Sequence, residues 1–330
     1  PSEVAAAIDR HLDGFLRAAK LEAVGPSDDT EFLRRIYLDL TGCVPDANQA
    51  RRFHDNPNSD KRSKLIDELL STSQFGRQFG RTWRDWVCPP ELPSTGNAGI
   101  QPHQQARAFG DWLGEKFASG KSWDNITRDI LTVRGEIKKQ PQVIFFGLVG
   151  KNGTTTADGS ARAVASLFLG LQLQCARCHD DPYRAWSQQE HWSLAAFFAR
   201  SQGDFKKIEV GKGPSKTRGL INIPKSAFKN AGTSVKVAFL DASSYIDHEK
   251  QRDLRSQLVD WMVAKDNPFF AKSFVNRVWF YLFARGIVNP IDDFRKLNPP
   301  SHPGLMKLLA SEFAASGYDV KHIFRCICRT

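Results

Sequence analysis

The 330-residue sequence contains no apolar run long enough to cross a membrane. The best run, Val143 to Val149, has the length of a buried strand or a short core segment, whereas a spanning helix needs about 20 apolar residues. The sequence also has no internal repeat and no low-complexity tract. With 41% hydrophobic and 25% charged residues, it is predicted to be a globular chain without a membrane span.

Cysteine is scarce, with six in the whole chain. Cys43 and Cys88 stand alone, and Cys326 and Cys328 are separated by one residue. Residues two apart on a helix point to different faces, so we expect the last two thiols to make separate contacts. Whether any of these four cysteines forms a disulfide stays open from the sequence.

Acidic residues are outnumbered, 36 against 46 basic ones, which gives a formal net charge of +10. This charge favours polyanionic partners such as an acidic polysaccharide or an acidic redox partner protein. No nucleic-acid recognition motif accompanies the charge, so we expect no nucleic-acid partner. The chain begins in polar sequence without a signal segment, which suits a cytoplasmic protein or a secreted one whose signal was removed.

Helical periodicity dominates both ends of the sequence. Ser27 or Asp28 is a candidate N-cap and Gly42 a candidate C-terminal stop, and Ser187 with Glu190 forms a capping box. Alternating apolar runs at 203–241 predict a small β insertion. The predicted fold is mainly α, with two packed helical modules. We assign a helical domain at 1–202, a Lys-rich β insertion or linker at 203–245 and a second helical domain at 246–330.

Cys175-Ala-Arg-Cys178-His179 is the attachment pattern of c-type haem. Positions i and i+3 of a helical turn lie on one face, so both thiols can reach the two vinyl groups at one porphyrin edge. A histidine directly after the second cysteine can then ligate the iron. The motif predicts one covalent haem c, held by Cys175 and Cys178 with His179 as axial ligand. Nearby aromatic residues are expected to shield the ring: Trp186, Trp192, Phe197 and Phe198.

Three other interpretations of the motif remain open. A structural zinc site needs two further ligands, and no second Cys-x-x-Cys or His-x-x-x-His pair is present. A thioredoxin-like redox pair is typical of a strand-to-helix turn, whereas this motif follows a helical pattern. A disulfide between Cys175 and Cys178 is the third interpretation.

The motif does not specify the sixth ligand of the haem iron, which has to come from elsewhere in the chain. Met262 and Met306 lie outside any short glycine- and proline-rich loop like the one that carries the distal methionine of small soluble cytochromes. His302, in the loop NPPSHP, is the leading distal candidate, and His322 is the alternative. Each also has a structural interpretation, His302 as a helix cap and His322 as a core histidine. Two further histidines are plausible ligands: His103 and His191.

Several long segments resemble the cytochrome-c-related domain pair of large secreted planctomycete-type proteins, two adjacent domains of unknown function. The matching segments are DTEFLRRIYLDLTGCVP (Asp29 to Pro45), Lys61 to Trp86, Leu167 to Ala199 with the cysteine motif, and Asp266 to Ile327. They occur in the family's order and cover most of the chain.

The resemblance implies export to the periplasm or cell surface and haem binding at the cysteine motif. Relatives commonly have histidine where this chain has Asp181, which would alter or remove any role of that position. Relatives also continue beyond Thr330, so we expect this C-terminus to be truncated. The family's polar positions in the second domain map onto Asn276, Arg277, Trp279, Asp292, Asp293, Asn298, Ser301, His302 and His322.

The leading hypothesis is an exported monohaem c-type cytochrome-like protein in electron transfer or haem-based redox chemistry. The alternative is a non-redox module that binds acidic polysaccharide or a partner protein, with the cysteines structural. An enzyme acting on glycans is the third idea, but no convincing hydrolytic pair emerges, since Asp180, Asp181, Asp292 and Asp293 also suit caps and ion pairs.

Overall fold

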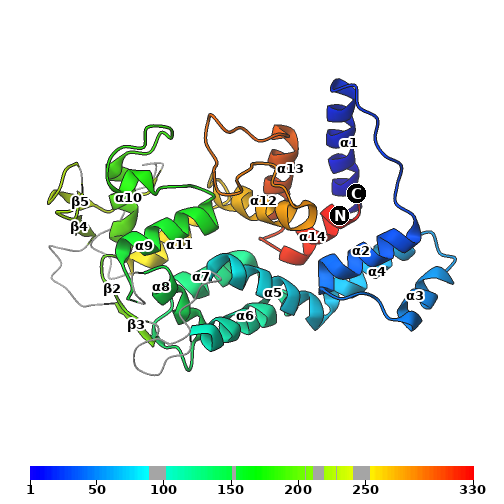
Figure 1. The fold of residues 1–330 in the computed structure, drawn as a ribbon, viewed down its shortest axis with the longest axis horizontal. Helices are drawn as coiled ribbons and strands as arrows, with labels where there is room; N and C mark the ends of the chain where they lie inside the picture. Colours follow the sequence, from blue (N-terminus) through cyan, green and yellow to red (C-terminus); the bar gives the residue numbers. More distant parts are fainter. Residues whose placement is uncertain (89–101, 151–153, 205, 211–218, 228, 241–252) are drawn as a thin grey trace.

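The computed structural model describes residues 1–330 except 89–101, 151–153, 205, 211–218, 228 and 241–252. This part of the chain is mainly helical, as predicted (Figure 1). Its α-helices are α1 (Ser2–Ala18), α2 (Asp29–Thr41), α3 (Ala47–His54), α4 (Lys61–Ser71), α5 (Ser73–Val87), α6 (Pro102–Ala118), α7 (Trp123–Leu131), α8 (Ile144–Leu148), α9 (Ala157–Val164), α10 (Gln188–Ala195), α11 (Leu254–Met262), α12 (Phe270–Phe283), α13 (Pro303–Ala315) and α14 (Val320–Cys328). Shorter helical segments are the 3-10 helices η1 (Pro141–Val143), η3 (Cys175–Arg177) and η4 (Ala196–Phe198) and the π-helix η2 (Ala165–Leu169).

The described strands form two small antiparallel sheets. One sheet has the order β1-β3-β2, from β1 (Gly135–Glu136), β2 (Ser201–Gly203) and β3 (Lys207–Val210). The other pairs β4 (Leu220–Asn222) with β5 (Ser234–Lys236). The predicted β insertion is therefore confirmed, but β1 comes from a segment that sequence periodicity did not mark as a strand.

The predicted helix boundaries follow local hydrogen bonds. The Asp28 carboxylate accepts a hydrogen bond from the Glu31 backbone N–H at 2.8 Å and begins α2, and Gly42 ends it in the left-handed region at φ 71°. Ser187 and Glu190 form the predicted capping box of α10. The apolar run from Val143 folds as the short buried helix α8, so it is a core segment and not a strand.

Helices α5 and α6 pack with their backbones in close approach. A Cβ atom at Gly80 would lie 2.5 Å from the backbone nitrogen of Gly114 and 2.6 Å from the carbonyl oxygen of Gly110. A Cβ at Gly76 would lie 2.3 Å from the Gly114 carbonyl oxygen. Only glycine fits at positions 76 and 80, so these two residues fix how near the two helices lie.

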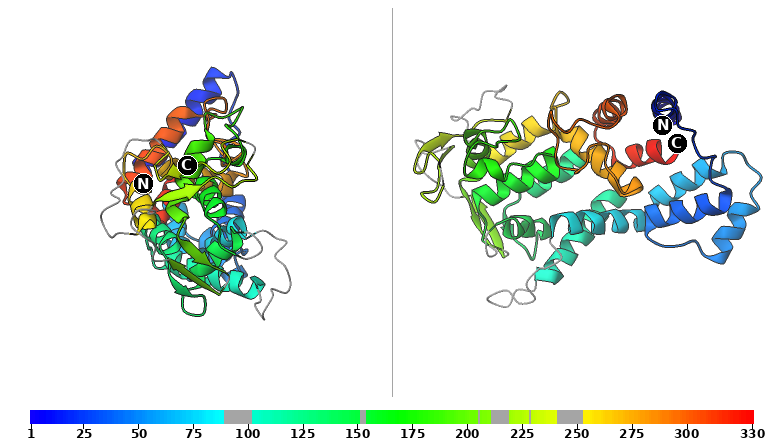
Figure 2. Two further views of the ribbon diagram at one scale, coloured as in Figure 1. Left: turned by 90° about the vertical axis from the view of Figure 1, so that its left-hand side faces the viewer. Right: turned by 45° about the horizontal axis from the view of Figure 1, so that its top comes forward.

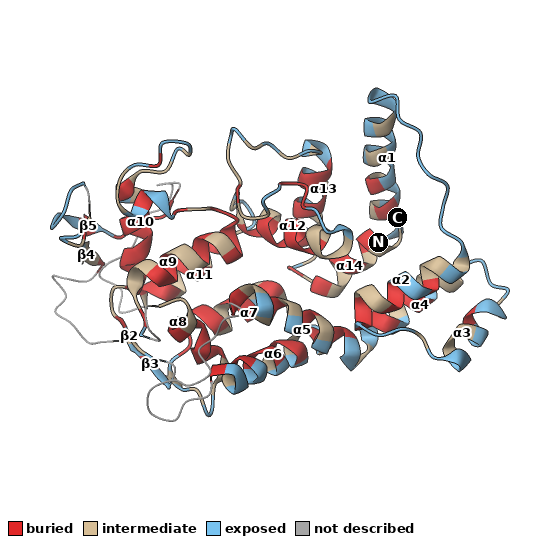
Figure 3. Cartoon of the chain, in the orientation of Figure 1, coloured by how far each residue is buried: buried red, intermediate tan, exposed pale blue. Residues whose placement is uncertain are grey.

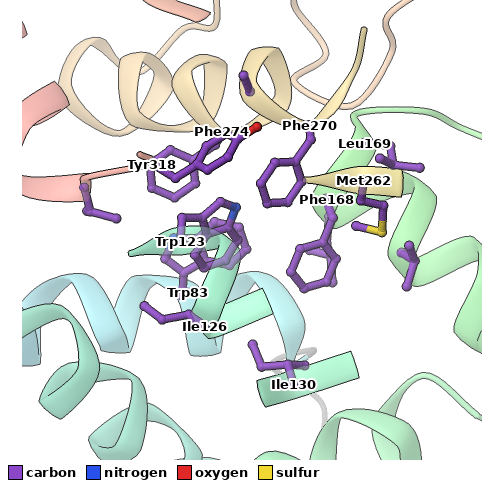
Figure 4. Close-up of a cluster of buried hydrophobic side chains, with 14 of the residues drawn as sticks. Trp83, Trp123, Ile126, Ile130, Phe168, Leu169, Met262, Phe270, Phe274 and Tyr318 are labelled. Carbon is purple, nitrogen blue, oxygen red and sulfur yellow. The ribbon is translucent and has the colours of Figure 1, made fainter. Parts of the chain in front are cut away.

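An aromatic cluster joins the beginning of the chain to its end. Trp83 of α5 lies 4.3 Å from Trp123 of α7, between ring centroids, and Trp123 lies 4.8 Å from Phe274 of α12. Phe168 of η2 lies 5.6 Å from Trp123. Figure 4 shows these rings gathered between α12 and the α5 and α7 helices. Because the cluster draws on both predicted helical modules, they share one continuous core.

The molecule is elongated (Figures 1 and 2). α2, α3 and α4 lie at one end, and α10 with the β4–β5 hairpin lies at the other. Buried residues occur in helices along the length of the molecule, whereas α1 and α3 are mostly exposed (Figure 3). Chain termini lie side by side, since the Arg329 guanidinium donates to the Ser2 hydroxyl. None of the described helices has the length and apolarity needed to cross a membrane.

Candidate haem-attachment site

The Cys-x-x-Cys-His motif lies on a single helical turn, as its spacing predicts. Gly170 ends η2 in the left-handed region, and the chain then runs to η3, which begins at Cys175. The backbone N–H groups of Cys178 and His179 donate to the Cys175 carbonyl at 3.2 and 3.4 Å. Ala176 faces the core, whereas Cys175 is exposed and Cys178 and His179 are half-buried. Cys175 is therefore open to solvent, and Cys178 is partly so.

Helix α10 holds the carbonyl groups of this turn from behind. The buried Gln188 amide donates to the Cys178 carbonyl at 3.0 Å and to the Lys229 carbonyl at 2.9 Å. The Trp192 indole N–H donates to the Arg177 carbonyl at 3.0 Å. A Lys229 backbone N–H supplies a second hydrogen bond to Cys178. These bonds satisfy the free end of the turn and fix its orientation.

The imidazole of His179 is oriented by the backbone carbonyl group of the next residue, Asp180. Its Nδ1 lies 2.7 Å from the Asp180 carbonyl oxygen, which can only accept, so Nδ1 carries the proton. Nε2 is therefore the nitrogen left with a lone pair, which is the usual arrangement of a metal-binding histidine. The Asp180 carboxylate accepts from the Gln188 backbone N–H and from Lys229 Nζ, and these two hydrogen bonds lower its pKa.

Asp181 shapes the loop after the motif. It is buried, and its Oδ1 accepts the backbone N–H groups of Tyr183 and Arg184. Arg184 in turn pairs with Asp181 at 3.4 Å and with Asp293 at 2.9 Å. The carboxylate at this position thus anchors the motif loop to the second helical region.

Polar side chains of the second helical region hydrogen-bond to backbone carbonyl groups and to side chains of residues that precede the motif. Arg277 donates to the carbonyl groups of Ser166 and Leu167, and burial lowers the pKa of its guanidinium to about 10. Asp292 accepts from the Ser166 hydroxyl and the Gln172 amide, at 2.7 and 2.8 Å. Arg277 and Asp292 therefore hydrogen-bond to backbone and side-chain groups of residues 166–172.

The side chains of Asp158, Arg177 and His191 form an ionic chain behind the turn, and the sequence did not predict this chain. Asp158 of α9 accepts from Arg177 at 3.1 Å and lies 3.0 Å from Nε2 of the buried His191. Burial alone would raise the pKa of Asp158, but the hydrogen bond with His191 and the charges of Arg162 and Arg177 hold that pKa below its ordinary value. The only sequence signal for Asp158 is its place in the first turn of a helix.

The four aromatic residues that were expected to shield the ring divide into two groups. Trp192 contacts the motif through its indole N–H. Trp186 packs against Phe269, Phe197 against Phe239 and Phe198 against Phe146, at centroid distances of 6.2, 5.2 and 6.2 Å. The Phe197 and Phe198 contacts lie within the core of the molecule, whereas Trp186 and Phe269 are partly buried and pack against that core.

The structure does not bring His302 or His322 to the motif. His302 lies 4.3 Å from the Phe15 ring of α1, between centroids, and its Nδ1 lies 2.9 Å from the Ser301 hydroxyl. His322 lies on α14, where its Nε2 is 2.6 Å from Glu312. Figure 1 shows α1 and α14 well separated from α10 along the long axis of the molecule. The assignment of His302 or His322 as the distal ligand of the haem iron stays a prediction.

The residues of the motif fit a covalently attached haem. All six cysteines lie among the described residues and all are free thiols, Cys175 and Cys178 included. Within the described part of the chain, the group of side chains that could hold a metal ion lies elsewhere, at Glu312, His322 and Cys326. The donor set at the turn is the one that c-type haem requires: one exposed and one half-buried free thiol, and an imidazole with a free Nε2.

Comparison with protein families gives two matches. Residues 7–203 match PSCyt2, described as a protein of unknown function (DUF1549), and residues 254–330 match PSD1, described as a protein of unknown function (DUF1553). No curated protein and no solved structure matches the chain.

Proposed function

Because the chain belongs to the PSCyt2 (DUF1549) family of planctomycete-type cytochrome-related domains, followed by a PSD1 (DUF1553) domain, we propose that it is an exported monohaem c-type cytochrome-like protein. Its place is the periplasm or the cell surface, and its role is electron transfer or haem-based redox chemistry. Cys175 and Cys178 hold one haem c, and His179 ligates the iron. When bound, the haem supplies a one-electron redox centre.

The observation that carries this proposal is the geometry of His179. Its Nδ1 is engaged by the Asp180 carbonyl oxygen at 2.7 Å, so its Nε2 is available to a metal. The same turn carries Cys175 and Cys178 as free thiols with access to solvent. The chain supports these residues with Gln188 and Trp192, which orient the turn from α10.

A non-redox binding module is the second candidate. The net charge of +10 favours it, because such a charge attracts acidic polysaccharide or an acidic partner protein whether or not a haem is present. The two candidates differ in one readily measured property, since only the cytochrome-like protein gains mass and colour at its cysteines.

The test is production of the chain in a host with cytochrome c maturation, followed by visible spectroscopy and intact mass. Each cysteine S–H adds across one vinyl group, so no atoms are lost and the expected gain is the mass of one haem. Cys175→Ala/Cys178→Ala should lose both the Soret band and the added mass. The control Cys43→Ala, at an exposed cysteine outside the motif, should keep both.

A colourless protein of unmodified mass would overturn the cytochrome proposal. Retention on an acidic polysaccharide column that falls with salt would then support the binding module. His179→Ala should keep the covalent haem while its Soret band shifts, because the thioethers remain and the axial ligand is lost. An unchanged spectrum in that variant would remove His179 from the iron.

A further inference from the structure

A second cluster of ligand-type side chains lies at the far end of the chain, on α13 and α14. Glu312 of α13 and His322 and Cys326 of α14 each offer one donor atom, and these atoms all lie within 4.8 Å of one another. The cluster shares no residue with the Cys-x-x-Cys-His motif. We propose that Glu312, His322 and Cys326 bind a divalent ion of the zinc class.

The local fold places the three side chains together. His322 and Cys326 are four residues apart on α14, so both lie on one face of the helix. α13 and α14 are joined by a tight turn in which Gly317 and Tyr318 are in the left-handed region, at φ 71° and 61°. This turn folds Glu312, near the end of α13, back over the first turns of α14.

The scaffold around the cluster is rigid. The Asp319 carboxylate caps α14 by accepting the His322 backbone N–H at 3.0 Å. The Tyr318 hydroxyl donates to the Val263 carbonyl at 2.9 Å, and its ring packs 5.4 Å from Phe313, between centroids. Ile323, Phe324 and Ile327 bury the opposite face of α14. A site built on two packed helices needs little rearrangement to bind an ion.

The distances fit tetrahedral coordination. Zinc–nitrogen and zinc–sulfur bonds of about 2.0 and 2.3 Å at a tetrahedral angle place the nitrogen and sulfur roughly 3.5 Å apart. Cys326 Sγ lies 3.5 Å from His322 Nε2. Glu312 Oε1 lies 2.6 Å from the same nitrogen, as in a hydrogen bond. The Glu312 side chain must withdraw by less than about 1 Å to reach zinc–oxygen geometry.

Glu312 and Cys326 contact the same ring nitrogen of His322, and this distinguishes the cluster from a catalytic triad. In a Cys-His-Glu triad, the thiol and the carboxylate contact opposite ring nitrogens, so that one orients the base for the other. Here Nε2 faces both Glu312 and Cys326. Donor atoms that converge on one point are arranged for a shared ion. Cys326 binds as the thiolate, and its proton passes to solvent.

The donor set also defines the class of ion. A thiolate with an imidazole favours zinc over magnesium or calcium, which prefer oxygen ligands. The side chains of His322 and Glu312 are 19% and 29% exposed, whereas Cys326 is fully buried. Solvent can therefore reach the fourth coordination position. Three protein ligands with one open position resemble the arrangement of catalytic zinc sites more than that of structural ones.

The test is zinc content per chain after saturation with Zn²⁺ under reducing conditions and removal of free ion. We expect one zinc per chain in the wild type and in Cys175→Ala/Cys178→Ala, so a failure of the haem proposal does not affect this result. In the Cys175→Ala/Cys178→Ala background, Cys326→Ser and His322→Gln should lose the zinc. The matched control is Cys328→Ser, a free thiol two residues along the same helix, which should keep it.

A second measurement covers a folding defect at the buried Cys326. Glu312→Gln changes a partly exposed side chain and should fold normally, yet it should bind Zn²⁺ at least about tenfold more weakly. Co²⁺ bound to the Cys175→Ala/Cys178→Ala variant should show a thiolate-to-cobalt charge-transfer band that Cys326→Ser abolishes. Absence of zinc from the wild type, or its retention in both Cys326→Ser and His322→Gln, would overturn the proposal.

Discussion

The aromatic core around Trp123 and the turn that carries Cys175 are held by different interactions. Trp123 is 1% exposed and is surrounded by the rings of Trp83, Phe168 and Phe274. The cysteine turn lies at the surface, and side-chain amides and an indole hold its carbonyl groups. The core thus depends on shape and apolar burial, whereas the turn depends on a few directed hydrogen bonds. The two regions should respond differently to substitution.

The largest effect is expected where α5 meets α6. Gly80→Ala places a Cβ within 2.6 Å of backbone atoms of Gly110 and Gly114, so the helices must separate. We expect a loss of about 3 kcal/mol in the free energy of unfolding. Gly14→Ala on α1 is the control, because no heavy atom lies within 4 Å of the added methyl group. It should gain up to about 1 kcal/mol through helix propensity. Equal stability of the two variants in urea unfolding would refute the packing argument.

Gln188→Leu should have a smaller effect that is concentrated at the motif. It removes the hydrogen bonds to the Cys178 and Lys229 carbonyls, which costs about 1–2 kcal/mol. Amide exchange at residues 175–179 should accelerate more than exchange in α5. The neighbouring Gln189→Leu, at an exposed position, serves as the control and should change neither. Uniform acceleration across the chain would show that the turn has no separate support.

Acidification should weaken the ionic chain behind the turn. The pKa of Asp158 is lowered in the folded protein, so its contribution to stability is complete above the unfolded pKa, near about 4, and is lost as the pH falls through the folded pKa. Asp158→Asn should cost about 1 kcal/mol at pH 7. The difference between wild type and variant should shrink at lower pH. A difference independent of pH would contradict this role for the carboxylate.

The smallest effect is expected at Lys229. Its ammonium group pairs with Asp180 at 3.0 Å, and both side chains are more than half exposed. Lys229→Ala should change the free energy of unfolding by less than about 0.5 kcal/mol and leave haem attachment intact. Thermal unfolding together with the Soret absorbance checks both. A loss of haem in this variant would mean that surface charge, and not only α10, holds the turn.

Sequence reasoning was most successful where structure is decided within a few residues. The caps at Asp28 and Ser187, the stop at Gly42 and the helical turn at Cys175 all depend on neighbours up to four positions away. Residue spacing alone carries that information. The mainly helical fold and the β insertion followed from the same local patterns.

Contacts between distant segments could not be predicted in this way. β1 pairs with β3 across more than 70 residues, at Gly135 and Ile208. The bond from Arg184 to Asp293 spans 109 positions. Glu312, His322 and Cys326 offered one sequence signal, the four-residue spacing of a histidine and a cysteine on one helix. The turn that returns Glu312 to them is visible only in the fold.

The most direct test of the central claim is the mass of one pair of tryptic peptides. Trypsin cleaves after Arg177, between the two cysteines, and yields peptides 163–177 and 178–184. If one haem bridges Cys175 and Cys178, the two peptides stay joined. Their combined mass then exceeds the sum for the separate, unmodified peptides by the mass of one haem, because the addition of each S–H across a vinyl group loses no atoms. Two separate peptides with unmodified cysteines, from protein made in a host with cytochrome c maturation, would contradict the account.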